Sequence, residues 1–302
     1  MSNSDTLNRV TGLLVIEVRH SNPNGDPDDE GEPRQIHTGQ QKGHGIISGV
    51  SYKRKLRDLL EWKEGDVWDI LSKELGIADE AHEFQILESR GRDRNKIWDM
   101  SGDEFRRCYW DARVFGNTFL ESLKEKLKGL SADQRKRELA KHEHFIRTGA
   151  AHFPNGVSVA PVEIERMTNT NKAGVEEGKD RGMAPQADRV VQHGVYCMSF
   201  FINPTAAKRS GCKLKDIDLL KRLIPYAYTH TASRARSAVE IRHAWYVEHD
   251  SPLGSYSDFA ILDALTPKKR ENPDMPSSSW QEYDVPGKLE GNGITCTDLM
   301  AR

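Results

Sequence analysis

The chain has 302 residues, of which 36% are apolar and 30% are charged, and its formal net charge is −2. That length predicts one domain with a large insertion or two coupled domains, and the polar composition indicates much surface facing solvent or partners. The near-neutral charge excludes a uniformly basic nucleic-acid-binding protein, so a basic surface for such a ligand has to be local.

The sequence also limits the cellular compartment and the kinds of metal or membrane site that we expect. No apolar stretch approaches the roughly 18 residues that span a bilayer, and the start MSNSDTLNR lacks the basic and apolar segments of a signal peptide. The cysteines lie far apart, without the paired spacing of a zinc site. We therefore expect a cytoplasmic protein with free thiols, no cofactor and no membrane segment. The cysteines are Cys108, Cys197, Cys212 and Cys296.

The N-terminal part predicts a strand, a turn and a helix. The apolar run at residues 13–18 indicates a buried strand, and NPNGDP at residues 22–27 is dense in turn-forming residues. A polar loop with several glycines continues to about residue 49. Residues 50–62 then predict an amphipathic helix, because their apolar side chains recur on one face.

Residues 63–153 predict a mostly helical insertion with a thin core. Short helical periodicities occur around residues 67–75 and 119–127, and residues 133–144 are nearly all charged. No continuous strand pattern interrupts this stretch.

The second half of the chain returns to strand patterns. Residues 168–182 are polar and predict a loop between two strands, and Pro225 is expected to end or kink a helix. The tail at residues 266–279 is rich in Pro, Ser and charge and predicts a loop. The expected strands are residues 157–164, 190–202 and 238–249, and the expected helix is residues 214–224. Without the insertion, the order is strand, helix, strand, strand, helix, strand, which is the ferredoxin-like order of the RNA-recognition fold.

The segment from Gly43 to Arg57 is the most informative candidate for ligand binding. Glycines such as Gly45 allow close approach of a ligand, and a helix that begins near Ser48 offers free N–H groups to phosphate. Lys53 and Arg57 are four residues apart and share one flank of that helix, whereas Arg54 points further round. The segment predicts a phosphate-binding row or, alternatively, an ordinary solvated basic face. Its glycine spacing fits neither a Walker A loop nor a dinucleotide fingerprint.

Two acidic or histidine-rich segments suggest metal sites and then fail the spacing tests. Residues 26–31 resemble the start of a calcium loop, but the twelfth position, which has to supply a carboxylate, is His37. His142 and His144 are two residues apart and point to different sides of a helix. We therefore expect no metal.

Three further groups of residues are candidates for RNA contacts. Arg234 and Arg236 lie between the last helix and the last expected strand, where a phosphate clamp fits. Met167 and Met183 flank the predicted hairpin loop, where apolar side chains can wedge between bases. Surface charge and core filling are the alternative interpretations. The third group is Arg90, Arg92, Arg94 and Lys96.

Several motifs, in order, resemble the backbone subunit of type I CRISPR surveillance (Cascade) complexes, closest to the type I-C branch of the repeat-associated RNA-binding (RAMP) superfamily. The resemblance runs from about residue 13 to residue 265. Departures at residues 183–186 (MAPQ) and 231–236 (TASRAR) leave the subtype open. The matching motifs are NPNGDP at 22–27, KRKLR at 53–57, DARVFG at 111–116, SVAPVE at 158–163 and HDSPLG at 249–254.

The resemblance implies an α+β fold in three parts: an RNA-recognition palm of antiparallel sheet and two helices, a helical fingers insertion, and a β-hairpin thumb. It implies non-catalytic copies that stack along one guide RNA, beside a large subunit and a crRNA-processing subunit, while the guide pairs with target DNA. Stacking of copies also accounts for a near-neutral charge, because acidic surface has to meet basic surface. The parts are palm at 1–62, 155–166 and 187–302 (with the tail), fingers at 63–154 and the thumb tip at 167–186.

The resemblance also implies roles for individual residues. Lys53, Arg54 and Arg57 are expected to bind RNA phosphates, and the stretch from Met167 to Met183 to form the thumb. The remaining expected RNA contacts are Arg34 and His37 in the nearby loop, Gly45 and Ser48 before the helix, Arg113, Arg189, and Arg234 with Arg236.

Two other functions stay open on the sequence alone. A type III-like relative that cuts RNA would use Asp26 or Asp28 with a divalent ion. A stand-alone RNA-binding module would act as a monomer.

Overall fold

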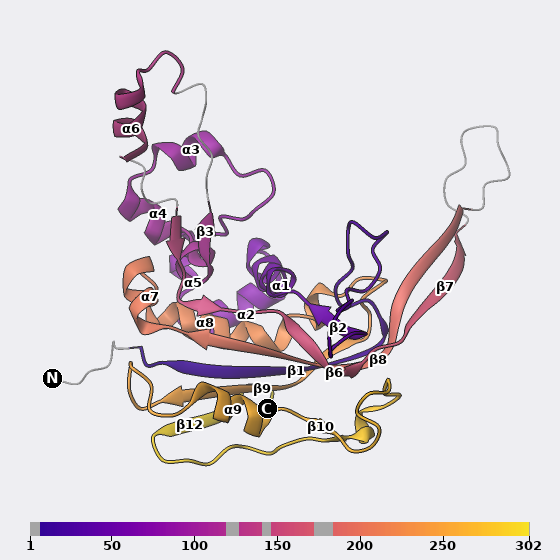
Figure 1. Ribbon diagram of the computed structural model, residues 1–302. Helices are drawn as coiled ribbons and strands as arrows, with labels where there is room; N and C mark the ends of the chain where they lie inside the picture. Colours follow the sequence, from indigo (N-terminus) through magenta and orange to yellow (C-terminus); the bar gives the residue numbers. More distant parts are fainter. Residues whose placement is uncertain (1–6, 119–126, 141–145, 172–183, 302) are drawn as a thin grey trace, which may run out of the picture.

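The computed structural model describes residues 7–118, 127–140, 146–171 and 184–301, and shows an α+β protein built on one antiparallel sheet (Figure 1). The main strands run in the order β12-β9-β1-β8-β6-β2, and β5 and β7 also pair with β8. Their bounds are β1 Val10–Ser21, β2 His44–Ile47, β5 Ala151–His152, β6 Gly156–Pro161, β7 Ile164–Asn171, β8 Ala184–Ile202, β9 Val239–His249 and β12 Ile294–Asp298.

Strand β1 is the centre of the sheet. It pairs antiparallel with β8 on one edge and with β9 on the other. Leu14 and Ile16 are buried against the helices, whereas Leu13 and Val15 are buried on the opposite face. Because both faces are covered, the strand is a continuous apolar run instead of an alternating one.

Helices α1 (Gly49–Glu61) and α8 (Leu214–Leu223) pack on one face of the sheet, where the sequence predicts them. Tyr52 and Leu56 of α1 and Ile217 of α8 have no exposed surface and belong to one apolar core. Pro225 lies in the short 3-10 helix Ile224–Tyr226 that follows α8, because proline suits the first turn of a helix but not its interior. Helices α2 (Asp66–Glu74) and α7 (Pro204–Ser210) and the 3-10 helix Thr229–Thr231 complete this side.

The described part of the insertion is mostly helical, as predicted, but it also contains short strands. It consists of short helices around a small separate core that includes Leu87, Trp98 and Phe105, and a β3–β4 pair leads into and out of its outer part. β5 also comes from this stretch and joins the main sheet, so the prediction of no strands there is wrong; two- and three-residue strands carry too few residues for a period to show. The predicted helical segment 119–127 lies mostly outside the described residues. The remaining elements are the 3-10 helix Ala78–Glu83, α3 Arg94–Asp99, α4 Gly102–Cys108, α5 Trp110–Phe115, β3 Gly116–Thr118, α6 Ala132–Ala140 and β4 Ile146–Thr148.

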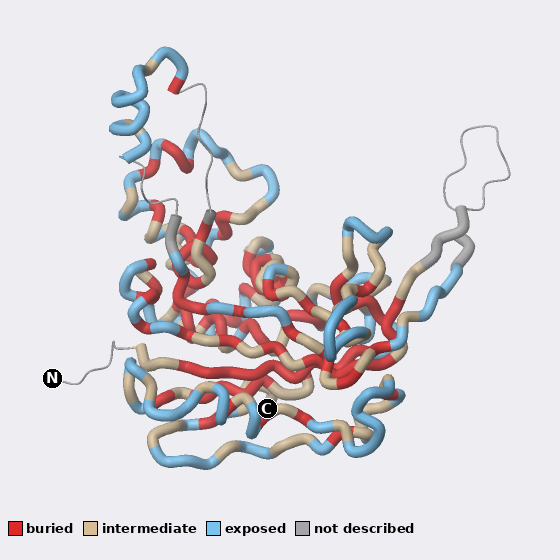
Figure 2. The backbone as a smooth tube through the Cα atoms, viewed as in Figure 1, coloured by how far each residue is buried: buried red, intermediate tan, exposed pale blue. Residues whose placement is uncertain are grey.

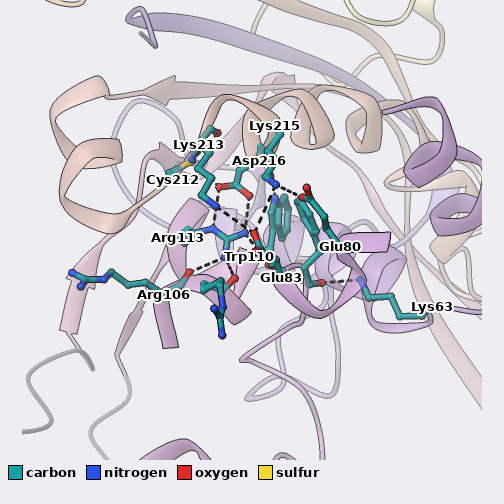
Figure 3. A network of polar contacts seen from close by, with 12 residues as sticks. Lys63, Glu80, Glu83, Arg106, Trp110, Arg113, Cys212, Lys213, Lys215 and Asp216 are labelled. Atoms are coloured by element: carbon teal, nitrogen blue, oxygen red, sulfur yellow. Dashed lines mark hydrogen bonds and ion pairs between the residues drawn. The ribbon is translucent and has the colours of Figure 1, made fainter. Parts of the chain in front are cut away.

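A buried ion pair fastens this insertion to the sheet's helices (Figure 3). Arg113 of α5 donates to both carboxylate oxygens of Asp216 in α8, at 3.0 and 2.7 Å, and the two side chains are 2% and 0% exposed. The other three N–H groups of the guanidinium donate to the carbonyls of Arg106, Arg107 and Glu83. All five donors of Arg113 are therefore used inside the protein.

The C-terminal part forms a second layer that the sequence did not predict. Helix α9 (Asp258–Leu265), the β10–β11 pair (Lys268–Lys269 and Tyr283–Asp284) and the 3-10 helix Trp280–Glu282 cover the face of the sheet opposite α1, while β12 pairs with β9 at the edge of the sheet. They bury Leu13, Val15, Val195, Trp245 and Val247 against Ile261, Leu265, Tyr283 and Cys296. Figure 2 shows the sheet buried between the two layers. Residues 266–279 are a loop, as predicted, apart from the two residues of β10, and the elements on either side of this loop cover the second face of the sheet.

The Arg113–Asp216 pair should dominate the stability of the insertion. Arg113→Ala leaves a buried carboxylate without its partner, so we expect the free energy of unfolding to fall by about 3–5 kcal/mol, measured by urea unfolding. Lys73→Ala removes an exposed pair with Asp69 and serves as the control, with a change within about 0.5 kcal/mol. Similar small losses for both variants would contradict the assigned role.

Asp298 should make the C-terminal layer sensitive to acid. Burial alone would raise the pKa of Asp298, but hydrogen bonds from His243 and from the N–H groups of Ala244 and Met300 hold the pKa below its ordinary value. A carboxyl whose pKa is lowered by folding stabilises the protein above its unfolded pKa, and this contribution disappears as pH falls through the folded pKa. We expect Asp298→Asn to reduce the loss of stability below about pH 4, relative to its stability at pH 7. Unfolding curves with unchanged acid dependence would refute this.

Candidate nucleic-acid interface

Two asparagine side chains hold together the loops at the end of β1. Nδ2 of Asn22 donates to the carbonyls of Gly31, at 2.6 Å, and Arg189, at 3.2 Å, and its N–H donates to the carbonyl of Ala235. Oδ1 of Asn24 accepts from the N–H of Ser48, at 2.7 Å. The loop after β1, the start of α1, the base of the β7–β8 hairpin and the loop before β9 therefore meet at one place. The sequence marked these asparagines only as turn residues.

Helix α1 lies between two projecting parts of the molecule, the insertion and the β7–β8 hairpin (Figure 1). Ser48 caps the helix by accepting from the N–H of Ser51, and the first turn contains no acidic residue. Val50 is 70% exposed. The positive end of the helix dipole is thus not neutralised by a side chain of its own first turn, a condition that favours anions.

Lys53 is a cation without a carboxylate partner in the described part of the chain. Its Nζ lies 6.0 Å from the ring centroid of Phe115. Burial, and then the charge of Arg57, lower the pKa of Lys53. Burial is the larger cause, and the nearby guanidinium of Arg57 adds to it because a like charge disfavours the protonated lysine.

Lys55 and Arg236 form a second uncompensated pair of cations, on the other flank of α1. Nζ of Lys55 donates to the carbonyl of Thr231 at 3.3 Å, and burial, followed by the charge of Arg236, lowers the pKa of Lys55. Nε of Arg236 is buried, and within the described ranges no acceptor pairs with it. Lys55 was not predicted as a site residue, although it lies inside the KRKLR motif.

Three other predicted arginines meet carboxylates. Arg34 pairs with Asp26 at 3.2 Å, and Arg234 pairs with Asp188 through two hydrogen bonds of 2.7 and 2.8 Å. Arg189 lies between two glutamates of the loop after β1. These arginines are each partly exposed and so remain accessible to a phosphate that displaces or shares the carboxylates. We define the basic surface as Arg34, Lys53, Arg189, Arg234 and Arg236; Lys55 is 6% exposed and lies beneath this surface, beside Arg236.

Three predicted contacts are buried and engaged inside the protein, and a fourth, Arg54, is partly exposed and bound to two carboxylates. Arg57 is 10% exposed and donates to Asp111 at 2.8 Å, and Arg113 has no free donor. Arg54 binds Asp58 and Glu61 and the carbonyl of Glu88. Gly45 is buried with its N–H on Ser158, and an added Cβ would lie 2.3 Å from the hydroxyl of Tyr196, so this glycine serves packing.

The remaining predicted residues are placed in different ways. His37 is exposed in the loop before β2, and Met167 is 41% exposed on β7. Met183, the loop tip and His142 to His144 lie outside the described residues. Arg92 in the insertion contacts Glu88 and the carbonyl of Leu87.

Neither a cluster of metal ligands nor a membrane-spanning helix occurs in the described residues. Over residues 7–118, 127–140, 146–171 and 184–301, no three His, Cys, Asp or Glu side chains gather as ion ligands. Asp26 instead accepts from Arg34 and from the N–H of Asp28. No helix in those ranges has the length and apolar character needed to cross a bilayer. All four cysteines are free thiols, with Cys212 and Cys296 buried.

Comparison with known proteins gives a consistent set of relatives. The family model of CRISPR-associated protein Cas7 matches residues 8–287. A "CRISPR-associated protein Cas7" of Haloferax volcanii is 26% identical over 261 residues, covering 83% of this chain and 73% of that protein. A chain of a solved "CRISPR RNA-guided surveillance complex" has 14% identity and a TM-score of 0.41, over 82% of this chain and 76% of its own. A chain of a pre-nicking surveillance complex has 16% identity and a TM-score of 0.43, over 80% and 78%.

Unpaired cations should matter more for binding than paired ones. We expect Lys53→Gln and Arg236→Gln each to weaken binding of single-stranded RNA and to reduce the slope of log affinity against log salt by up to about 1, measured by fluorescence anisotropy. Arg54→Gln, whose charge is already neutralised, is the control and should change affinity little. Equal losses for all three would show that only net charge matters.

Proposed function

The chain belongs to the CRISPR-associated protein Cas7 family, and from this membership we propose that it binds guide RNA as the repeating backbone subunit of a type I surveillance complex. Several copies stack along one RNA, and pairing of the guide with target DNA supplies the sequence specificity. Its other partners are a large subunit and a crRNA-processing subunit. The type I-C branch and a cytoplasmic location are the finer parts of this proposal.

The observation that carries the proposal is the uncompensated positive charge beside the N-terminus of α1. Lys53, Lys55 and Arg236 make no ion pair with a carboxylate in the described part of the chain, and burial, followed by the charges of Arg57 and Arg236, lowers the pKa of the two lysines. Placing like charges together disfavours the folded state unless a ligand supplies the missing negative charge. The phosphates of a single strand supply such charge at regular spacing.

The three parts of the proposed subunit (palm, fingers and thumb) can be assigned to segments of the chain. Residues 1–62, 155–166 and 187–302 are the palm of the RNA-recognition type, residues 63–154 the fingers, and residues 167–186 the thumb. Support comes from the projection of the β7–β8 hairpin beyond the sheet and of the insertion on the other side of α1 (Figure 1). Exposed Met167 on the hairpin is in a position to contact a base.

We propose that the chain has no catalytic role. The rival function, RNA cleavage by a loop aspartate, requires Asp26 or Asp28 to hold a divalent ion. Asp26 is paired with Arg34, and among the residues that the structure describes Asp28 is exposed and belongs to no group of three metal-ligating side chains.

Assembly on RNA distinguishes the backbone subunit from a stand-alone module. We expect the mass measured by size-exclusion chromatography with light scattering to rise in steps of one subunit as guide RNA is lengthened. We also expect the RNA to remain intact after incubation with Mg²⁺ or Mn²⁺, both with the wild type and with Asp26→Ala. A constant one-to-one complex would support the monomeric module, and metal-dependent cleavage lost in Asp26→Ala would support the nuclease.

A further inference from the structure

An acidic turn lies directly beside the basic surface. Residues 26–32 contain five carboxylates in seven positions, namely Asp26, Asp28, Asp29, Glu30 and Glu32. Such a concentration of negative charge next to a site for phosphates opposes binding unless its carboxylates have a specific use.

Two of these carboxylates, Glu30 and Glu32, form ion pairs with one arginine, Arg189. Nη2 of Arg189 donates to Glu30 at 3.0 Å, and Nη1 lies 3.4 Å from Glu32 without making a hydrogen bond. Glu30 is 82% exposed, Glu32 is 34% exposed and Arg189 is 27% exposed. Asp28 and Asp29 are exposed at the end of the same turn, and they make no ion pair in the part of the chain that the structure describes.

The turn is built to keep the glutamates at this arginine. Asn22 binds the carbonyls of Gly31 and Arg189 with the same amide nitrogen, which fixes the turn against the base of the hairpin. Glu30 has a φ of +46°, a left-handed conformation that costs free energy for a residue with a side chain.

We propose that Glu30 and Glu32 are specificity-determining counter-ions of the RNA site, which occupy Arg189 until phosphates of an RNA strand replace them. This inference rests on the proposed function. An exposed ion pair is weak, so a strand that contacts several cations at once displaces it, whereas an isolated phosphate gains too little. The glutamates thereby lower affinity for short or single anions and favour an extended strand.

Two double variants with equal charge changes test the proposal. Glu30→Gln with Glu32→Gln removes the carboxylates that touch Arg189, and Asp28→Asn with Asp29→Asn removes two that touch no cation. Binding of a single-stranded RNA of about 8 nucleotides, a length that one small domain can cover, is measured over a series of salt concentrations. A short RNA keeps the readout to one copy.

We expect the glutamate variant to bind this RNA about threefold to tenfold more tightly at low salt, and the aspartate variant to gain clearly less. The salt dependence of the glutamate variant should also become steeper, because no freed carboxylate takes up a cation when RNA binds. In an Arg189→Gln background the glutamate substitutions should have little effect, since the competition passes through that arginine.

Each contrary result has a distinct meaning. Equal gains in the two double variants would show a general field effect and overturn the counter-ion role. Weaker binding by the glutamate variant would show that the glutamates hold Arg189 for RNA, which also overturns it. If the wild type binds RNA, either of these two results leaves the proposed function intact. If neither the wild type nor any variant binds RNA, both the proposed function and this inference are wrong.

Discussion

Burial of β1 on both faces is the constraint on which the rest of the molecule depends. Hydrogen bonds to β8 and β9 fix both of its edges, and the two layers of side chains fix its faces. Where this strand leaves the sheet, Asn22 and Asn24 direct the following loop onto the start of α1 and the base of the hairpin. The position of every cation in the basic surface therefore follows from a strand that has no freedom to shift.

The elements with strong periodicity were predictable from the sequence, and those held by distant polar contacts were not. The α+β class, β1, α1 and α8 follow from apolar patterns that local physics imposes. The roles of the arginines do not. Arg57 shares a helix flank with Lys53, yet its partner is Asp111, 54 residues further along the chain, and no local pattern reveals such a pair. Lys55 was missed because an amphipathic helix with three adjacent basic residues gives no sign of which one will stand beside Arg236.

Ion pairs also explain how a chain with a net charge of −2 presents a basic surface. Most of its arginines in this region are matched by nearby carboxylates, whether buried, as for Arg113, or partly exposed, as for Arg234. The positive charge that has no carboxylate partner is carried by a few side chains around one end of α1. A small excess in the right place has a large local effect because screening limits surface charges to about 8–10 Å.

The covered second face of the sheet determines how a nucleic acid can lie on this protein. RNA-recognition domains that read sequence stack bases on aromatic side chains of an open sheet. Here Trp245 and Tyr283 are buried in the core that the C-terminal layer forms with the sheet, so neither ring is open to a base. An RNA held at the surface around α1 is gripped by its backbone, so the edges of its bases stay turned toward whatever strand comes to pair with them. The fold therefore suits binding of an RNA whatever its sequence, with its bases left available for pairing.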